Sequence, residues 1–469
     1  MKIKSFMFIS LIIMATVLTG CSTDSDSPAN ILTNTNSVTD STNDTRNSNT
    51  GTIKVSCGKD AAYSGEESVL EVTFENFEKV PEKVDVYYEG NDNPLSSNLT
   101  VSSGKITITT PANYAKNTIS YFVKSGSSES NHISLNYYNS VTVSNFESFI
   151  NSITSTDVVN IKVTGNYEDF KTKTELLKNE NLKINLDISQ LSNVVIGEKT
   201  FSECKSLVGI KLPDNITSIG KQAFAGCTSL VGIKLPDNIT SIGDRAFLSC
   251  FNLAEITFPN KLTTIGIRAF ASFGTNSNKL TSIELPETLL IIGDGAFLRC
   301  KELVTVKLQN GITTIGREAF GCCEKLKNIY LPDSITSIGD DAFNCCLSLN
   351  SITIPSGVTE IPDSAFAGCK NLENVIIPNG ITTIGNVAFD GCIKLETIEF
   401  PSTITKIVVW AFHDCNNLKN VIFTERTGWK VTNHNTSEET NVSDNDLADT
   451  AKSALYLRET YLKHTWTRS

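Results

Sequence analysis

The sequence predicts a mainly β protein with short helical turns, in which a solenoid of ten 23-residue rungs follows an immunoglobulin-like β-sandwich. Three observations predict this fold. A phenylalanine recurs at a fixed interval through much of the chain, and each copy is followed by a short strand-like stretch that usually ends at a proline. Upstream of these repeats, a separate stretch alternates apolar and polar residues between turn-forming clusters.

The repeating phenylalanines define the solenoid. They stand 23 residues apart, except for one step of 27 residues in which Gly274–Ser277 lengthens a loop. A constant period in this range is typical of solenoids, in which each unit buries its apolar face against its neighbours. Such an array presents a long ordered surface, so the period favours a binding protein. The ten are Phe201, Phe224, Phe247, Phe270, Phe297, Phe320, Phe343, Phe366, Phe389 and Phe412.

One repeat contains two predicted strands and a turn. Leu230–Leu235 alternates like a strand with one buried face, and Pro236 ends that strand because proline cannot donate to a ladder. A second extended piece, such as Ile216–Ile219, leads to Gly220, which we expect to permit the next turn. The following segment, Asp244–Cys250 in one repeat, is predicted to be a helical or 3₁₀ turn.

These residues resemble the BspA-like, or treponemal-type, leucine-rich repeat family. The shared motif is Leu-x-x-Ile-x-Leu/Ile-Pro-x-x-Val/Ile-Thr-x-Ile-Gly-x-x-Ala-Phe-x-x-Cys, and it covers about half of the chain. Local departures include Phe273 in a cysteine position and Pro362 and Val408 in glycine positions. The resemblance implies a non-catalytic surface protein that acts in attachment, coaggregation or host-cell interaction.

The N-terminus resembles an export signal with a lipid-attachment site. Lys2 and Lys4 precede a short apolar run, and Leu18–Cys21 looks like a bacterial lipobox. This predicts cleavage before Cys21 and lipidation of its thiol; the alternative is an ordinary signal with a chance cysteine. The predicted parts are a signal peptide (1–20), a Ser/Thr/Asn/Asp-rich tether (21–50), the sandwich (51–138), an N-terminal cap (139–195), the solenoid (196–424), and a polar linker with a capping helix over Asp446–Lys463 (425–469).

Composition argues against several function classes. The net charge of −11 disfavours binding to nucleic acid or directly to anionic lipid. The four histidines belong to no zinc, phosphate-loop or nucleophile motif, so we predict no catalysis, no cofactor and no metal. The run His413–Cys415 contains a histidine and a cysteine, but sequence adjacency does not establish a catalytic pair.

Nine cysteines follow the repeat phenylalanines by three residues. We expect a column of buried free thiols, with a metal array or a chain of disulfides as the alternatives. Cys322 and Cys345 lie beside this column, one period apart, and are the best candidates for a disulfide. The nine are Cys204, Cys227, Cys250, Cys300, Cys323, Cys346, Cys369, Cys392 and Cys415.

The tenth residue after each phenylalanine is predicted to point outward. This column runs through Lys211, Lys234, Thr257, Glu284 (displaced by the four-residue insertion), Lys307, Tyr330, Thr353, Ile376, Glu399 and Ile422. Its basic, aromatic and apolar members would suit a protein ligand. We therefore predict a ligand-binding face at Lys211, Lys234, Lys307, Tyr330, Ile376 and Ile422, against the alternative of a merely solvated strand face.

The favoured function is that of a lipid-anchored protein in the bacterial envelope, at the outer membrane or cell surface. The resemblance implies host extracellular or cell-surface proteins as partners, or other bacterial surfaces, with the membrane reached only through the lipid on Cys21. Alternatives are a carbohydrate-binding lipoprotein, a structural envelope protein, and a polysaccharide-cleaving enzyme for which Glu255 and Glu284 are the nearest acidic pair.

Overall fold

The structure is a computed structural model that describes residues 52–57, 61–63, 67–75, 81, 83–88, 94–102, 104–109, 118–125 and 128–468. The chain divides into two compact units between Ser140 and Val141. The predicted signal peptide, the lipidation site Cys21 and the tether all lie outside the described residues.

The first unit is built mainly from antiparallel strands, with β2 paired in parallel to β9. β3 pairs with β1 and β6, and β7 pairs with β4, β8 and β9. Both sets contribute to one core, which contains Val55, Leu70, Val86, Ile106 and Tyr121. The immunoglobulin type of this unit stays a prediction. The strands are β1 (Thr52–Cys57), β2 (Ala61–Tyr63), β3 (Glu67–Glu75), β4 (Lys83–Tyr88), β5 (Ser96–Thr100), β6 (Lys105–Thr109), β7 (Thr118–Ser125), β8 (Ser128–Glu129) and β9 (Ile133–Thr142).

The second unit begins with elements that already have the geometry of the repeats. β10 pairs in parallel with β11, and β11 pairs in parallel with β13 of the first full rung. The buried rings of Phe146 and Phe170 lead into the repeat phenylalanines. The elements are η1 (Val143–Asn145), α1 (Phe146–Ser152), β10 (Val158–Asn166), α2 (Tyr167–Lys171), η2 (Thr174–Lys178), β11 (Lys183–Asp187) and β12 (Leu191–Ser192).

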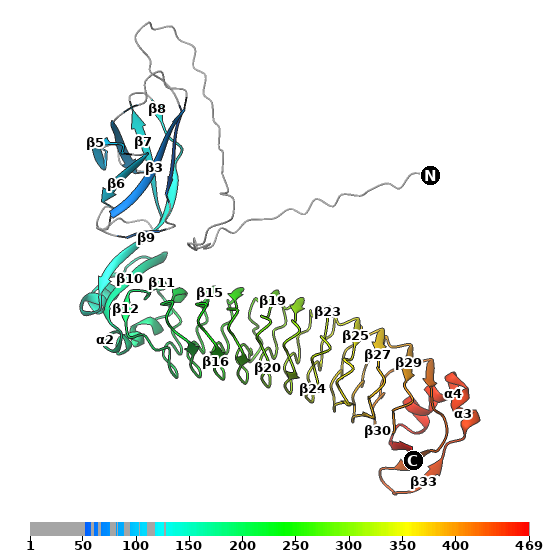
Figure 1. Ribbon diagram of the computed structural model, residues 1–469. Coiled ribbons are helices and arrows are strands. Elements are labelled where there is room, and N and C mark those ends of the chain that lie inside the picture. The colour runs from blue at the N-terminus through cyan, green and yellow to red at the C-terminus, as the bar shows by residue number, and fades with distance from the viewer. Residues whose placement is uncertain are drawn as a thin grey trace, which may run out of the picture. The chain divides into compact units, whose positions relative to one another are not determined.

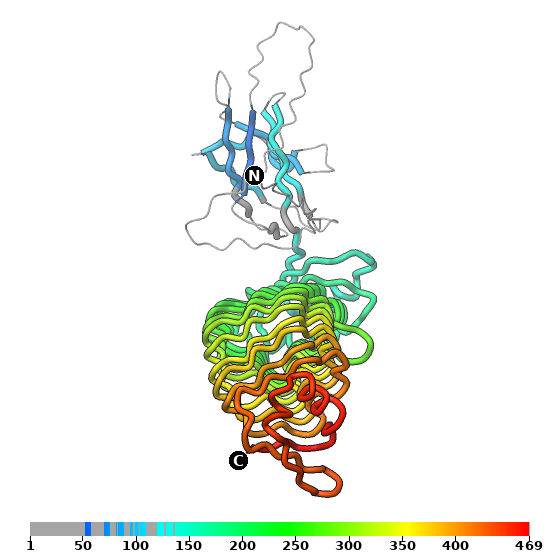
Figure 2. The backbone as a smooth tube through the Cα atoms, turned by 90° about the vertical axis from the view of Figure 1, so that its right-hand side faces the viewer, coloured from blue at the N-terminus to red at the C-terminus, as the bar shows by residue number. Residues whose placement is uncertain are grey.

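The solenoid has the two short strands per rung that the sequence predicts, and successive rungs stack in parallel (Figures 1 and 2). The first strands are β13 (Leu207–Lys211), β15 (Gly232–Lys234), β17 (Glu255–Thr257), β19 (Ser282–Glu284), β21 (Thr305–Lys307), β23 (Asn328–Ile329), β25 (Ser351–Thr353), β27 (Asn374–Ile376), β29 (Thr397–Phe400) and β31 (Asn420–Phe423). The second strands are β14 (Ser218–Ile219), β16 (Ser241–Ile242), β18 (Thr264–Ile265), β20 (Ile291–Ile292), β22 (Thr314–Ile315), β24 (Ser337–Ile338), β26 (Glu360–Ile361), β28 (Thr383–Ile384) and β30 (Lys406–Ile407).

The repeat phenylalanines form one continuous stack inside the solenoid. The nine consecutive ring pairs have centroid separations of 5.1–5.7 Å and interplanar angles of 1–13°. Near-parallel rings favour an offset arrangement over a face-to-face sandwich, and their buried area dominates the energetics of such a core. The core is therefore a column that grows by one ring with each rung.

The segment between the repeat glycine and cysteine is not the predicted helical turn. The chain forms no helix from 193 to 443. Instead, each rung places the residue two positions before its phenylalanine in the left-handed region, as at Arg245 with φ 55°. Nine of the ten rungs do the same two positions after it, as at Ser249 with φ 57°. Residues in this conformation interrupt a right-handed helix, so the chain turns sharply on both sides of the buried ring.

The repeat glycine allows neighbouring rungs to pack closely. It is not needed to provide a positive φ. A Cβ built on Gly220 would lie 2.4 Å from the carbonyl carbon of Gly197, and one built on Gly339 would lie 2.4 Å from the amide nitrogen of Arg317. Neither glycine has a left-handed backbone. The absence of a side chain at these positions lets the backbones of neighbouring rungs approach.

The C-terminal end is a small sheet with short helical pieces, where the sequence predicted a linker and one helix over Asp446–Lys463. β34 pairs antiparallel with both β30 and β32, so it covers the last exposed edge of the second-strand sheet. The single helix is wrong because the helical stretch breaks at Asp449, whose ψ of 105° is extended. The elements are β32 (Trp429–Asn433), β33 (Glu439–Asn441), α3 (Asp444–Ala448), α4 (Thr450–Leu455), η3 (Tyr456–Thr460) and β34 (His464–Arg468).

Candidate interaction face

The first strands of the rungs carry two outward columns, which we call the first-strand face. It consists of the eighth and tenth residues after each phenylalanine. All ten residues of the tenth-position column are exposed, including Tyr330 at 68%, Ile376 at 60% and Ile422 at 38%. Parallel pairing sets neighbouring members side by side, as in Thr353 beside Ile376 and Glu399 beside Ile422. The alternation predicted for these strands therefore gives a continuous face.

The three lysines of this face differ in their partners. The Lys307 ammonium pairs with Glu284 of the preceding rung, and Lys211 Nζ lies 4.0 Å from the buried Asp187 carboxylate. Lys234 forms no ion pair within the described part of the chain. Because exposed pairs such as Lys307–Glu284 contribute little to stability, that contact positions the Lys307 side chain more than it stabilises the fold. In the other pair the Asp187 carboxylate is buried while the Lys211 side chain is exposed.

The face changes character near its middle. From Phe201 to Lys307 its positions include five charged residues, namely Lys211, Lys234, Glu255, Glu284 and Lys307. From Asn328 to Ile422 they include one, Glu399, among Asn, Ser and Thr residues and the exposed Tyr330, Ile376 and Ile422. Protein interfaces are depleted in charged residues at their centres and enriched in aromatic ones. The part of the first-strand face between Asn328 and Ile422 has that composition.

The second strands offer a smaller apolar patch. Leu290 and Ile291 are 47% and 44% exposed, one step before the buried Ile292 of β20. Because β20 belongs to a different sheet from the first strands, this patch is a separate surface that serves as an internal comparison.

The nine repeat cysteines form a column of hydrogen-bonded thiols. Cys227 donates to the Phe201 carbonyl oxygen at 3.0 Å, and the same bond recurs to Cys415, which donates to that of Phe389 at 3.0 Å. Burial raises the pKa of all nine thiols, to about 12 in Cys300, Cys369 and Cys415. The column is thus neutral and structural at ordinary pH.

One rung replaces its cysteine in a way that the sequence did not reveal. Phe273 occupies the cysteine position but is 40% exposed, because the four-residue insertion carries the chain outward. The buried Asn278 donates from its side-chain amide to the Phe270 carbonyl oxygen at 3.0 Å, the oxygen to which the Cys300 thiol of the next rung also donates. In the other rungs the cysteine stands three residues before a leucine. Locating the cysteine position by counting back from Leu280, and not forward from Phe270, would have pointed to this loop.

The buried thiols predict alkaline instability. Unfolding exposes thiols that ionise near pH 8.5, whereas the folded thiols stay protonated to about pH 12, so stability falls as the pH rises through this window. Each thiol contributes up to about 1.4 kcal/mol of loss per pH unit. Urea unfolding at pH 7.5 and 10 should show the C369A variant, which loses the 3.2 Å bond to Phe343, less stable at pH 7.5 but losing less on the shift to pH 10. Equal losses in both proteins would contradict this account.

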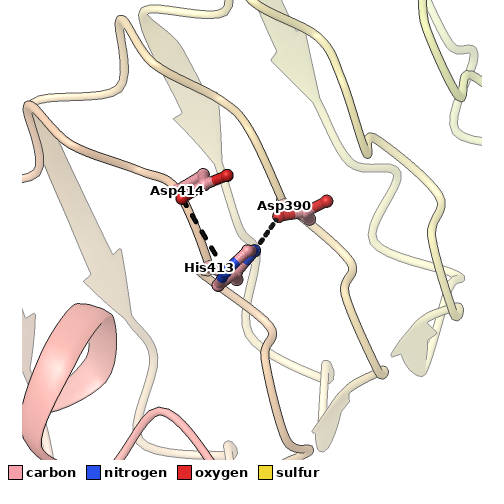
Figure 3. A group of neighbouring side chains, drawn as sticks. All are labelled: Asp390, His413 and Asp414. Carbon is pink, nitrogen blue, oxygen red and sulfur yellow. Dashed lines mark hydrogen bonds and ion pairs between the residues drawn. The ribbon is translucent and has the colours of Figure 1, made fainter.

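His413 pairs with carboxylates and not with Cys415. Its Nδ1 lies 2.7 Å from an Asp390 carboxylate oxygen on the preceding rung, and its Nε2 lies 3.7 Å from Asp414 (Figure 3). The Cys415 thiol instead donates into the column. One ligand atom from each of Asp390, His413 and Asp414 falls within 4.8 Å of the others, which is the arrangement that could hold a metal ion. The two carboxylates, however, face different nitrogens of the His413 ring, so the imidazole lies between them and contacts both. Asp390 was not among the predicted site residues, and the only signal for it in the sequence is that it stands one period before His413.

The nearest acidic pair for catalysis lies on two strands that do not pair with each other. Glu255 lies on β17 and Glu284 on β19, and these strands belong to different sheets. Glu284 also accepts a hydrogen bond from Gln309 at 3.3 Å, in addition to its pairing with Lys307. Its carboxylate is therefore bound by two side chains of the following rung, which does not favour a free general acid at this position.

No helix within the described ranges is both long and apolar enough to span a membrane. Among curated proteins none matches the chain. Solved structures that resemble it include a leucine-rich repeat protein from Bacteroides ovatus (24% identity, 74% of this chain and 88% of that one, TM-score 0.44). Others are a leucine rich cell surface protein from Faecalibacterium prausnitzii (26%, 65% and 86%, TM-score 0.34) and the T. pallidum leucine rich repeat protein (28%, 45% and 78%, TM-score 0.29).

The repeat region itself matches a family model. The model is described as a BspA type leucine rich repeat region, and it matches in six copies over residues 171–275, 272–362 and 336–452. These segments together span residues 171–452, more than half of the 469 residues. The repeat motif, the stacked phenylalanines and the thiol column lie within this span. The chain belongs to the BspA-type leucine-rich repeat family.

Proposed function

We propose that the chain is a non-catalytic bacterial surface lipoprotein that adheres to host proteins or to other cells through the first-strand face of its solenoid. The observation that carries the proposal is that the first-strand face between Asn328 and Ile422 has one charged residue, Glu399, and exposes Tyr330 and Ile376. Aromatic and apolar side chains supply most of the energy of protein interfaces. Leucine-rich repeat proteins generally bind other proteins, which supports the same class of partner.

Export and lipid anchoring belong to the same proposal. The apolar run before Leu18–Cys21 supports them, with the thiol of Cys21 as the attachment point. The polar tether would place the repeats away from the membrane. A protein held in this way meets partners outside the cell, which suits an adhesive role.

The test is binding of purified 22–469 to matrix glycoproteins, bacterial surfaces and glycans. A variant with Lys234→Glu, Tyr330→Ala and Ile376→Ala should lose binding at least 100-fold, because removing two interface anchors costs about 2 kcal/mol or more each. A matched variant carries Leu290→Ala and Ile291→Ala on the second-strand patch and Lys261→Glu at an exposed lysine outside the first-strand face, and it should bind as the parent does.

The outcomes separate the alternatives. Loss of binding only in the second-strand variant would move the site to the other surface. Retention on glycans, with no bound protein or cell, would replace the proposal with the carbohydrate-binding alternative. Circular dichroism and the thermal midpoint of both variants should match the parent, since all six substituted side chains are exposed.

A further inference from the structure

Two cysteines outside the thiol column share one repeat position. Cys322 and Cys345 each stand two residues after a phenylalanine, on consecutive rungs. Both have a left-handed backbone, with φ of 55° and 57°, and both are half-buried. Their amide nitrogens donate to the next rung in the same way, Cys322 to Asn344 and Cys345 to Ala367, at 2.7 Å each. The two residues are therefore equivalent sites related by a single rung step.

The spacing of these rungs suits a covalent link. The rings of Phe320 and Phe343, two residues before each cysteine, are 5.7 Å apart. Disulfides join Cα atoms that are usually 4.4–6.8 Å apart, and neighbouring parallel strands lie about 4.8 Å apart. Equivalent positions on adjacent rungs therefore fall within the range that a disulfide spans.

Side chains at this position point toward the following rung. A Cβ built on Gly368, the equivalent residue of the next rung, would lie 3.1 Å from Cys345 Sγ. A Cβ built on Gly226 would likewise lie 2.2 Å from the Glu203 carboxylate of the rung before it. In the same direction, Cys322 reaches Cys345, and the two free thiols share a hydrogen bond.

The pair differs chemically from the column next to it. The hydrogen bond donated by the Cys345 thiol lowers the pKa of Cys322, and the cations of Arg299 and Lys301 lower it further. Burial instead raises the pKa of Cys323 and Cys346, the adjacent column thiols. Thiolates are the reactive form of cysteine, so Cys322 combines reactivity with access, whereas its hydrogen bond with Cys345 and burial raise the pKa of the Cys345 thiol.

We propose that Cys322 and Cys345 form a reversible disulfide that links two neighbouring rungs. The oxidant is a disulfide, either a protein oxidoreductase or a small-molecule disulfide. The Cys322 thiolate attacks one of its sulfurs, which forms a mixed disulfide and releases one thiol. The Cys345 sulfur, on losing its proton, then attacks Cys322 Sγ and releases the second thiol. Two protein thiols are thereby oxidised while the external disulfide is reduced to two thiols.

The test is the thiol state of the purified chain, measured without any ligand. The protein is incubated with oxidised glutathione, unfolded in iodoacetamide, digested and analysed by mass spectrometry. We expect peptides that contain Cys322 and Cys345 to be joined, two hydrogen masses lighter than their sum, and to separate after dithiothreitol. The C57S variant, which removes a half-buried thiol of the first unit, should retain the link.

The opposite results are equally specific. Two alkylated thiols after incubation with oxidised glutathione, or a glutathione attached to each, would overturn the proposal. A link from either cysteine to Cys323 or Cys346 would do so as well. The C345S variant supplies a second readout, because Cys322 should then carry a single glutathione that the parent does not accumulate.

Discussion

Replacing Phe297 with alanine is expected to destabilise the solenoid by about 3–5 kcal/mol, the usual cost of removing a fully buried phenylalanine. The ring is completely buried and stacks on Phe270 at 5.3 Å and on Phe320 at 5.5 Å. The substitution therefore breaks the aromatic column on both sides of one rung. Few neighbouring side chains can fill the gap, because the backbones of the flanking rungs are held by parallel strands.

The position of Phe297 makes the effect more than local. Each rung contacts only its neighbours, so coupling between the two halves of the array passes through this interface. We expect the urea unfolding curve of F297A to separate into two transitions, where the parent unfolds with greater cooperativity. Hydrogen exchange should show earlier opening of β19 and β21 than of β15 or β27.

Phe273 provides a control of the same residue type. Its ring is 40% exposed, and its main contact is the Arg268 guanidinium, 5.7 Å from the ring centroid. F273A should change stability by no more than about 0.5 kcal/mol. Equal effects of F297A and F273A would show that the aromatic column is not the main support of the solenoid.

The repeat period carried most of what could be predicted about the solenoid. A strict interval of 23 residues identifies which side chains share a column, and alternation within Leu230–Leu235 identifies which of them are buried. Leu230, Ile233 and Leu235 are indeed buried while Lys234 is exposed. These features depend on side-chain polarity at fixed spacing, which a single sequence states directly.

The turns beside each phenylalanine could not be predicted because their conformation is imposed between rungs. The left-handed position two residues before the ring is occupied by residues as different as Gly295, Val387 and Trp410. Valine has almost no intrinsic tendency toward this conformation. Its amide donates to Val409 of the next rung at 3.4 Å, as the equivalent amides do along the array. The hydrogen bonds between stacked rungs therefore select the left-handed conformation, and the intrinsic preference of the residue does not.

The features of the candidate face also divide into those that a single sequence predicts and those that depend on contacts between rungs. The outward column followed from alternation, whereas the pairing of His413 with Asp390 and of Lys307 with Glu284 depends on rung register. The C-terminal end lies outside the repeat, so the 23-residue period could not indicate how its apolar residues are arranged. The helical spacing of Leu447, Ala451 and Ala454 suggested one helix, and β34 carried no comparable signal.

Replacing Trp466 with alanine is expected to open the C-terminal end of the solenoid at a cost of about 3–5 kcal/mol. Trp466 is 1% exposed on β34 and lies opposite Ile407 of β30 and Val431 of β32. Its indole packs at 6.0 Å from Phe423, the last apolar side chain of β31, and at 6.3 Å from Trp429. One side chain therefore joins the final rung to the strands that cover it.

Loss of this contact should expose a strand edge as well as apolar surface. The Arg468 amide donates to the Thr405 carbonyl at 2.8 Å, so detachment of β34 leaves the edge of β30 unpaired. An unpaired parallel edge beside Phe423 and Trp429 is a site for association with other chains. We expect W466A to show faster hydrogen exchange in β30 and β31 and concentration-dependent aggregation below the thermal midpoint of the parent.

Trp410 distinguishes the cap from a general effect of losing tryptophan. It is 38% exposed, and its backbone amide, which donates to Leu462 at 2.9 Å, remains in an alanine variant. W410A should keep parental exchange in β30 and show no more aggregation than the parent. If W466A did the same, the last rung would be stable without its cover, because the energy of the array would lie within the rungs and not in the closure of their exposed end.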